Sequence, residues 1–131
     1  MILSSFRDIG WGCLFIFAEN DEMINWSDFE KIEIRTGTIL EAHDFPEARK
    51  PAFRLLIDFG ELGVRKSSAQ ITGFYKKEDL PGKQIVAVLN FPPKQIGPFI
   101  SECLVLGAIT EEGEVILLQT ERKAGNGLRI A

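Results

Sequence analysis

Apolar side chains occupy every second position between residues 53 and 59, and this alternation restricts the segment to an extended strand. One face of the segment holds Phe53, Leu55, Ile57 and Phe59, and the opposite face holds Arg54, Leu56 and Asp58. Successive side chains of a strand point to opposite faces of its sheet, whereas a helix would distribute these residues around its axis. The period of two recurs from residue 27 onward, so the sequence predicts a chain built mostly of β-strands.

Turn residues separate the other predicted elements. A long strand begins at Ile32 and Ile34, and further strands are predicted over residues 64–71, 84–91, 103–109 and 115–118. Turns are predicted over residues 60–63 and at Pro81-Gly82. Short helices are predicted over residues 28–31, with Ser27 as the cap, and over residues 76–80.

The first predicted strand changes its apolar phase at Gly37. Ile32 and Ile34 occupy even positions, whereas Ile39 occupies an odd one. An internal glycine with a change of phase predicts a β-bulge, which bends a strand enough to close a small barrel. Five or six strands, one short helix and a bulged first strand therefore predict an all-β fold, a small closed Greek-key barrel.

Residue counts argue against catalytic and metal chemistry. The 131 residues are 45% apolar and 26% charged, which is typical of one soluble globular domain. Two cysteines, Cys13 and Cys103, and one histidine, His43, are too few for a disulfide framework or a four-ligand zinc site. Cys103 is expected to be buried, and His43 is expected in a loop or at a strand end. No glycine spacing matches a P-loop or a dinucleotide fingerprint, so neither a cofactor nor a metal is expected.

Residues 1–22 differ from the rest of the chain. They contain an apolar run over residues 9–18, flanked by Arg7-Asp8 and by an acidic segment. This run is too short to span a bilayer, which takes about 20 residues, so no membrane association is expected. The alternatives are a signal peptide, which Asp8 disfavours, and an extension outside the fold that precedes a natural start at Met23.

Charge restricts how the chain could bind RNA. The net charge is −4, and without residues 1–22 the 14 lysines and arginines face 15 aspartates and glutamates. Such a balance is not that of a protein that holds nucleic acid by charge alone, so binding must use a local patch and shape. Basic residues gather on the second and third predicted strands, which is where oligonucleotide-binding barrels meet nucleic acid. Strand phase makes Arg54 and Lys66 candidate RNA contacts, and the alternative is an ordinary solvated surface.

The segment over residues 90–102 is unusually apolar for a loop. It holds three prolines and a glycine, together with Phe91, Ile96 and Phe99. A loop that lies free in water seldom carries several large apolar side chains. The segment is therefore expected either to pack over the barrel end or to form an interface.

Several motifs follow one another along residues 27–131. They are Phe29-Glu-Lys-Ile-Glu-Ile-Arg-Thr-Gly-Thr38, Ser67-Ser-Ala-Gln-Ile-Thr72, Asn90-Phe-Pro-Pro-Lys-Gln-Ile96, Ser101-Glu102 and Val105-Leu-Gly107. In this order they resemble the CsaA proteins, a bacterial and archaeal family of tRNA-binding-domain proteins described as secretion chaperones. Residues 75–83 more distantly resemble a segment of the domain appended to some methionyl- and phenylalanyl-tRNA synthetases.

The resemblance implies an OB-fold, a five-stranded Greek-key barrel with a short helix and terminal extensions that pair two subunits into a homodimer. It also implies a cytoplasmic protein without a catalytic site that recognises tRNA by shape. The positions that match the family, and are expected to contact RNA, are Ser67, Ser68, Gln70, Asn90, Lys94, Ser101 and Glu102. Two departures from the synthetase-type domains are Lys77 in place of a proline and Gln95-Ile96 in place of Met-Arg, which removes one phosphate contact.

Two functions follow from these observations. The first is a non-catalytic protein that binds tRNA or another structured RNA as a homodimer, whose two faces hold one RNA together. The alternative is an export-related chaperone that receives unfolded secretory precursor proteins on Phe91, Ile96 and Phe99. For these three residues, burial in the dimer interface is the competing interpretation.

Overall fold

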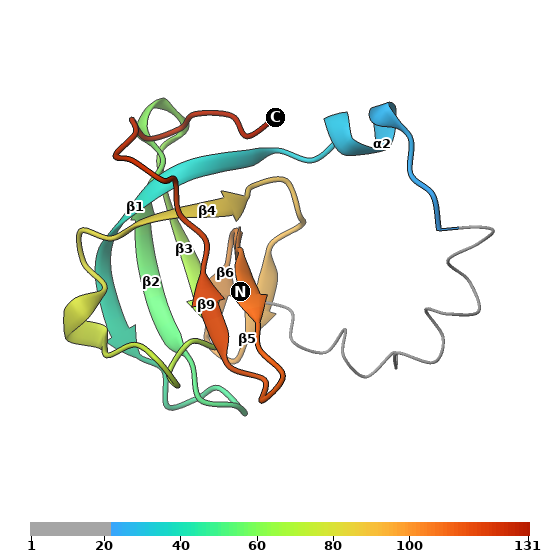
Figure 1. Cartoon of the computed structure of the whole chain (residues 1–131). Coiled ribbons are helices and arrows are strands. Elements are labelled where there is room, and N and C mark those ends of the chain that lie inside the picture. Colours follow the sequence, from blue (N-terminus) through green and yellow to red (C-terminus); the bar gives the residue numbers. More distant parts are fainter. Residues whose placement is uncertain (1–21) are drawn as a thin grey trace.

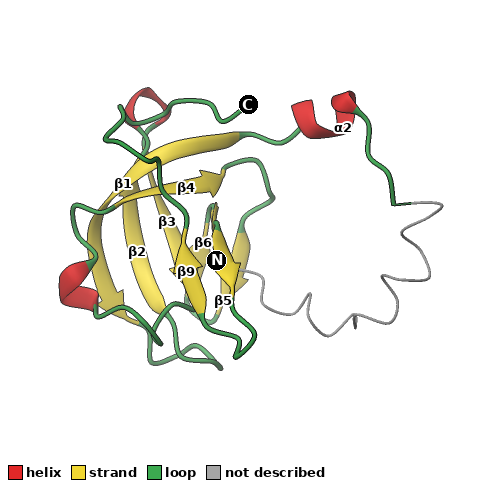
Figure 2. Ribbon diagram, in the orientation of Figure 1, coloured by secondary structure: helices red, strands yellow, loops and turns green. Residues whose placement is uncertain are grey.

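The structure, a computed structural model, describes residues 22–131. Strands dominate the described part of the chain (Figures 1 and 2). The helical elements are the α-helix α2 (Trp26–Glu30) and two 3₁₀ helices, η2 (Gly60–Leu62) and η3 (Lys77–Asp79). The strands are β1 (Ile34–Asp44), β2 (Phe53–Asp58), β3 (Val64–Ala69), β4 (Gln84–Val88), β5 (Lys94–Ile96), β6 (Phe99–Ser101), β7 (Leu104–Val105), β8 (Gly107–Ile109) and β9 (Val115–Leu117).

The strands form a five-stranded antiparallel OB-like barrel, as the sequence predicted. Its order is β3-β2-β1-β4-β7, and the hairpins β5–β6 and β8–β9 form two smaller sheets. The barrel is completed where β3 meets the segment that joins β6 to β7. There the Glu102 amide donates to the Lys66 carbonyl oxygen at 2.8 Å, which takes the place of a continuous ladder between the two end strands.

The core confirms the alternation in β2. Phe53, Leu55 and Ile57 are buried, as is Phe59 immediately after the strand, and Arg54 points to the other face. The inner side chains of the other strands fill the same core. The period of two in the sequence is thus the division between a packed interior and an outer face.

The predicted bulge at Gly37 is wrong in its position. Gly37 pairs regularly with Ile85 of β4, and the register instead shifts between Ile39 and Glu41. Gly37 lies against the ring of Phe59, where an added Cβ would come within 2.6 Å of a ring carbon. The apolar phase changes early because the outer side of this part of β1, at Thr36, is covered by the C-terminal segment.

The N-terminal elements also differ from the prediction. Asn25, not Ser27, caps the first helix, because its Oδ1 accepts from the Asp28 amide at 2.9 Å while the Asp28 carboxylate accepts from the Asn25 amide. The first strand begins at Ile34 rather than Ile32. Residues 1–21 lie outside the described residues, and so do Cys13 and the apolar run predicted there.

The segment predicted as a loop forms the hairpin β5–β6. Gly97 allows its tight turn with a φ of 58°, and Lys94 pairs with Ser101 at the open end. The prolines flank the two short strands, which is why the sequence indicates a loop. Within residues 22–131, no helix is long and apolar enough to cross a membrane.

The predicted environments of Cys103 and His43 are confirmed. Cys103 is buried, and this burial raises the pKa of its thiol. His43 is exposed near the end of β1 and forms a contact of 2.8 Å with Glu41.

Candidate nucleic-acid interface

The outer face of β1, β2 and β3 presents two rows of neighbouring side chains. The pairing of the strands places His43, Arg54 and Ser68 in one row, and Glu41, Leu56 and Lys66 in the next. Residues directly opposite in an antiparallel ladder share a face of the sheet. The bulge in β1 decides the composition of these rows, because without the extra residue Glu41 and His43 would point into the barrel.

Two aromatic rings border these rows. Phe45 follows β1, Phe99 lies in β6, and their rings meet edge to face at a centroid distance of 5.3 Å. The Arg54 guanidinium lies 5.9 Å from the centre of the Phe45 ring, and the Lys66 ammonium lies 5.4 Å from the centre of the Phe99 ring. The two adjacent rings therefore have one cation at each end, in the order Arg54, Phe45, Phe99, Lys66.

A hollow of about 340 Å³ opens among these residues, and we call it the outer hollow. It is lined by Glu41, His43, Arg54, Leu55, Leu56, Lys66 and Phe99. Leu56 and Phe99 supply apolar surface, whereas the charged residues surround it. Arg54 is held in place by a hydrogen bond of 3.1 Å from its Nε to the Asp44 carbonyl oxygen.

The predicted serines lie beside the outer hollow but are buried. The Ser67 hydroxyl donates to the Cys103 carbonyl oxygen at 2.9 Å, and the Ser101 hydroxyl accepts from the Ser68 amide at 3.2 Å. Glu102 acts similarly, because its carboxylate accepts from the Lys66 amide at 2.9 Å. These side chains close the barrel, and by doing so they fix Lys66 and Phe99 relative to each other.

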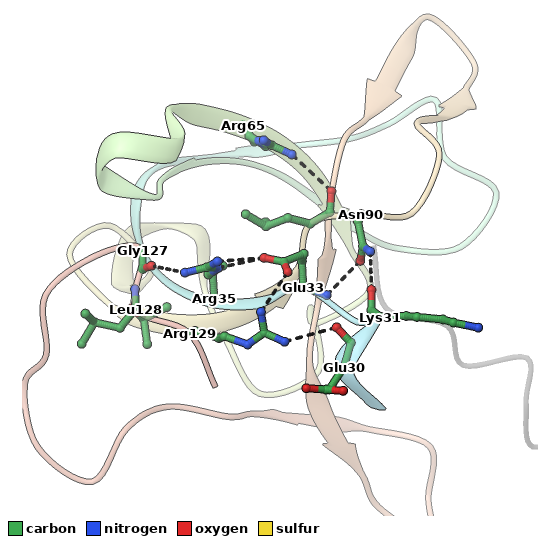
Figure 3. A network of polar contacts seen from close by, with 11 residues as sticks. Glu30, Lys31, Glu33, Arg35, Arg65, Asn90, Gly127, Leu128 and Arg129 are labelled. Atoms are coloured by element: carbon green, nitrogen blue, oxygen red, sulfur yellow. Dashed lines mark hydrogen bonds and ion pairs between the residues drawn. The ribbon is translucent and has the colours of Figure 1, made fainter. Parts of the chain in front are cut away.

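Asn90 lies in a separate polar network (Figure 3). Its side chain accepts from the Glu33 amide at 3.0 Å and donates to the Lys31 carbonyl oxygen at 2.6 Å. Arg129, near the C-terminus, contacts the Glu33 carboxylate and the Glu30 carbonyl oxygen. Asn90 and Arg129 thus hold the segment that joins α2 to β1.

Glu33 is the acidic centre of that network. The hydrogen-bonded guanidinium of Arg35 lowers the pKa of the Glu33 carboxyl below its ordinary value, and the charge of Arg129 acts in the same direction. Both cations are therefore engaged within the protein.

Two other predicted RNA contacts come from the neighbouring segments. Lys94 is exposed in β5, on the hairpin that also carries Phe99. Gln70 is half-buried directly after β3. The structure thus brings Arg54 and Lys66 together in one site, with Lys94 on the adjoining hairpin. The serines and Asn90 instead form hydrogen bonds within the protein.

The sequence patterns do not indicate Glu41, Phe45 or Leu56 as site residues, and they indicate a different site for Phe99. Phe45 stands in a segment whose sequence predicts a plain loop, and Glu41 follows the bulge that shifts the register. A correctly placed bulge would have indicated Glu41, because it moves that residue to the outer face. Phe45 is found only through its contact with Phe99.

Residues 34–129, which contain all the strands described above, match the family described as "Putative tRNA binding domain". The chain belongs to this family. Methionine–tRNA ligase of Methanocaldococcus jannaschii is 37% identical over 114 residues, which are 86% of this chain and 17% of the ligase. The chain thus spans about one sixth of the length of this tRNA-binding-domain relative.

Two solved structures have a higher sequence identity to this chain than the ligase has. The chaperone CsaA of Bacillus anthracis is 55% identical, with a TM-score of 0.80, and the alignment covers 83% of this chain and 99% of that one. The CsaA chaperone protein of Picrophilus torridus is 56% identical, with a TM-score of 0.78, and the alignment covers 83% of this chain and all (100%) of that one. These matches confirm the resemblance that the sequence motifs indicate.

Proposed function

We propose that this protein is a non-catalytic, cytoplasmic tRNA-binding protein that acts as a homodimer. The observation that carries the proposal is the family match over the whole barrel, in a chain whose outer face has a basic and aromatic site. The small net charge agrees with recognition of RNA shape at a local patch.

Within this proposal, Arg54, Lys66 and Lys94 contact the RNA backbone. Ser67, Ser68, Ser101 and Glu102 support the site by closing the barrel beneath it, and Gln70 lies at its edge. Asn90 orients the segment that leads to α2. This division assigns phosphate contact to the cations, and it assigns the geometry of the site to polar groups that form hydrogen bonds within the protein.

The homodimer is supported by apolar side chains that the single chain leaves exposed. Helix α2 buries none of its residues and stands apart from the barrel (Figure 1), and Met23, Ile24 and Trp26 are 82%, 70% and 66% exposed. Ile116 and Leu118, in and after β9, are also exposed. Large apolar side chains left exposed in this number are typical of a protein that buries them against a partner.

Replacing Lys66 and Lys94 together with alanine is expected to lower tRNA affinity by about tenfold at low salt. The slope of log affinity against log salt should fall by about one for each phosphate that the variant no longer neutralises. Titration of bulk tRNA by fluorescence anisotropy at several salt concentrations measures both quantities. Lys123→Ala, which removes a basic residue from another surface of the barrel, serves as the matched control.

An unchanged salt slope in the double variant would remove these lysines from the site. Light scattering on the same samples measures the oligomeric state. The expected mass is twice that of one chain, and a single-chain mass at all concentrations would contradict the homodimer.

A second function is favoured by the two solved structures named as CsaA chaperones. In it, Phe91, Ile96 and Phe99 receive unfolded secretory precursors. Phe91, which precedes the hairpin, is 50% exposed and Ile100 in β6 is 44% exposed, whereas Ile96 and Phe99 are half-buried. The accessible part of this surface is therefore Phe91 and Ile100.

The double variant Phe91→Ser, Ile100→Ser is expected to lose most of any ability to suppress aggregation of an unfolded precursor. Apolar surface is what such a client would bind, so its removal weakens the interaction. Light scattering of a refolding client measures the effect, and Phe74→Ser, at a residue that is 57% exposed elsewhere, is the control. Equal suppression by both variants would reject this surface.

A further inference from the structure

We propose that the outer hollow receives one unpaired nucleobase of the bound RNA, and that it prefers a base with an exocyclic amino group, such as cytosine. The proposal deepens the tRNA-binding function proposed above and rests on it. It assigns to Glu41, Leu56 and Phe99 a role distinct from that of the cations Arg54, Lys66 and Lys94.

The size and walls of the outer hollow fit a single planar group. A volume of about 340 Å³ lies at the small end of ligand pockets, so a base enters where a double helix does not. Leu56 and Phe99 are half-buried and present apolar surface, and every base has a π-face that packs on such surface. An extruded base is thereby removed from water on one side.

Contacts within the chain hold Phe99 in position. Its ring meets Phe45 edge to face at 5.3 Å, and the Lys66 ammonium lies 5.4 Å from its centre. Beneath it, Ser101 and Glu102 tie β6 and the following residue to β3. A site whose parts are fixed in advance loses less conformational entropy on binding.

The charges around the outer hollow complement a nucleotide. Among the described residues, Arg54 and Lys66 form no ion pair, whereas Lys77 pairs with Asp44, and Arg35 and Arg129 pair with Glu33. Two cations beside an apolar hollow are placed to bind the phosphate that accompanies the base.

Glu41 supplies the preference among bases. One of its carboxylate oxygens contacts His43 at 2.8 Å, and in the described part of the chain its other oxygen has no hydrogen bond. A carboxylate accepts from the amino group of cytosine, adenine or guanine. Uracil has one carbonyl oxygen, O4, where cytosine has its amino group, so at this position it offers the carboxylate an acceptor instead of a donor.

The test uses the full-length protein and three RNA probes measured by fluorescence anisotropy. The probes are a blunt hairpin, the same hairpin with a single-stranded 3′ extension of cytidines, and the same hairpin with an extension of uridines. The cytidine extension is expected to raise affinity about tenfold over the blunt hairpin, the gain typical of one stacked base. The uridine extension is expected to give a smaller gain.

Two variants test the named roles. Phe99→Ala should reduce the affinity ratio of extended to blunt hairpin to about one, and Phe99→Leu is the substitute if the alanine variant does not fold. Glu41→Gln should equalise the cytidine and uridine probes, because an amide both donates and accepts. Phe74→Ala, an exposed aromatic outside the hollow, is the control and should keep both ratios.

Equal binding of all three probes by the unaltered protein would overturn the proposal, and so would a cytidine preference that survives Glu41→Gln. If an unfolded peptide abolishes the higher affinity of the extended hairpins, and cytidine and uridine extensions bind equally, the hollow binds a protein ligand instead. If only the inference is wrong, the protein still binds tRNA in a way that depends on Lys66 and Lys94. If the proposed function is wrong, the protein binds neither tRNA nor any of the three probes.

Discussion

Replacing Phe59 with alanine is expected to lower the free energy of unfolding by about 3–5 kcal/mol. The ring is fully buried and is among the largest side chains that the barrel encloses completely. It packs against Gly37 in β1, which has no side chain of its own to fill the space that removal of the ring leaves. The destabilisation therefore combines reduced burial with a persistent cavity.

Urea denaturation followed by circular dichroism measures this effect. Phe74→Ala is the matched control, because Phe74 is 57% exposed and its truncation should change stability by less than about 0.5 kcal/mol. Gly37→Ala alone should cost about 1–3 kcal/mol by overpacking, and less in the Phe59→Ala background, where the added methyl group enters the cavity. Strict additivity of the two substitutions would contradict direct packing between these residues.

Replacing Thr36 with valine is expected to lower the free energy of unfolding by about 2–3 kcal/mol. Thr36 is 1% exposed, and its hydroxyl donates to the Gly125 carbonyl oxygen at 2.7 Å and accepts from the Leu128 amide at 2.9 Å. Valine has nearly the same shape but leaves both backbone groups without this partner. The substitution would therefore weaken the attachment of the C-terminal segment to β1, although it creates no cavity.

The control for this prediction is Thr36→Ser, which keeps the hydroxyl and removes only a methyl group, at about 1 kcal/mol. Chemical denaturation gives the stability, and limited proteolysis with intact-mass analysis shows whether the chain beyond residue 120 is released first. If the valine and serine variants are equally stable, the hydroxyl does not hold the C-terminal segment.

Local patterns predicted the parts of the fold that depend on neighbouring residues. The alternation in β2 identified its inner face, because a strand with one packed side must repeat with a period of two. The hairpin β5–β6 was missed, since the prolines around it favour a loop and each strand is three residues long. The capping residue was misplaced by two positions, because Asn25 and Ser27 are both residue types that cap helices.

The candidate site was predicted only in part. Strand phase identified Arg54 and Lys66, because outward side chains of β2 and β3 can be counted from the inward ones. That Ser67 and Ser101 form hydrogen bonds within the barrel could not be predicted, because these bonds join strands far apart in the sequence. Glu41 could not be placed without the true position of the bulge.

An all-β barrel, its packed face and the family can be predicted from the amino-acid sequence, because residue periodicity and motifs within short segments indicate them. The position of the bulge in β1, the burial of the serines, and the contact of Phe45 with Phe99 beside Arg54 and Lys66 are known only from the folded chain. Each of these depends on contacts between segments that are distant in the chain. The residue pattern of one strand does not indicate which side chains of the C-terminal segment or of the opposite strand pack against it.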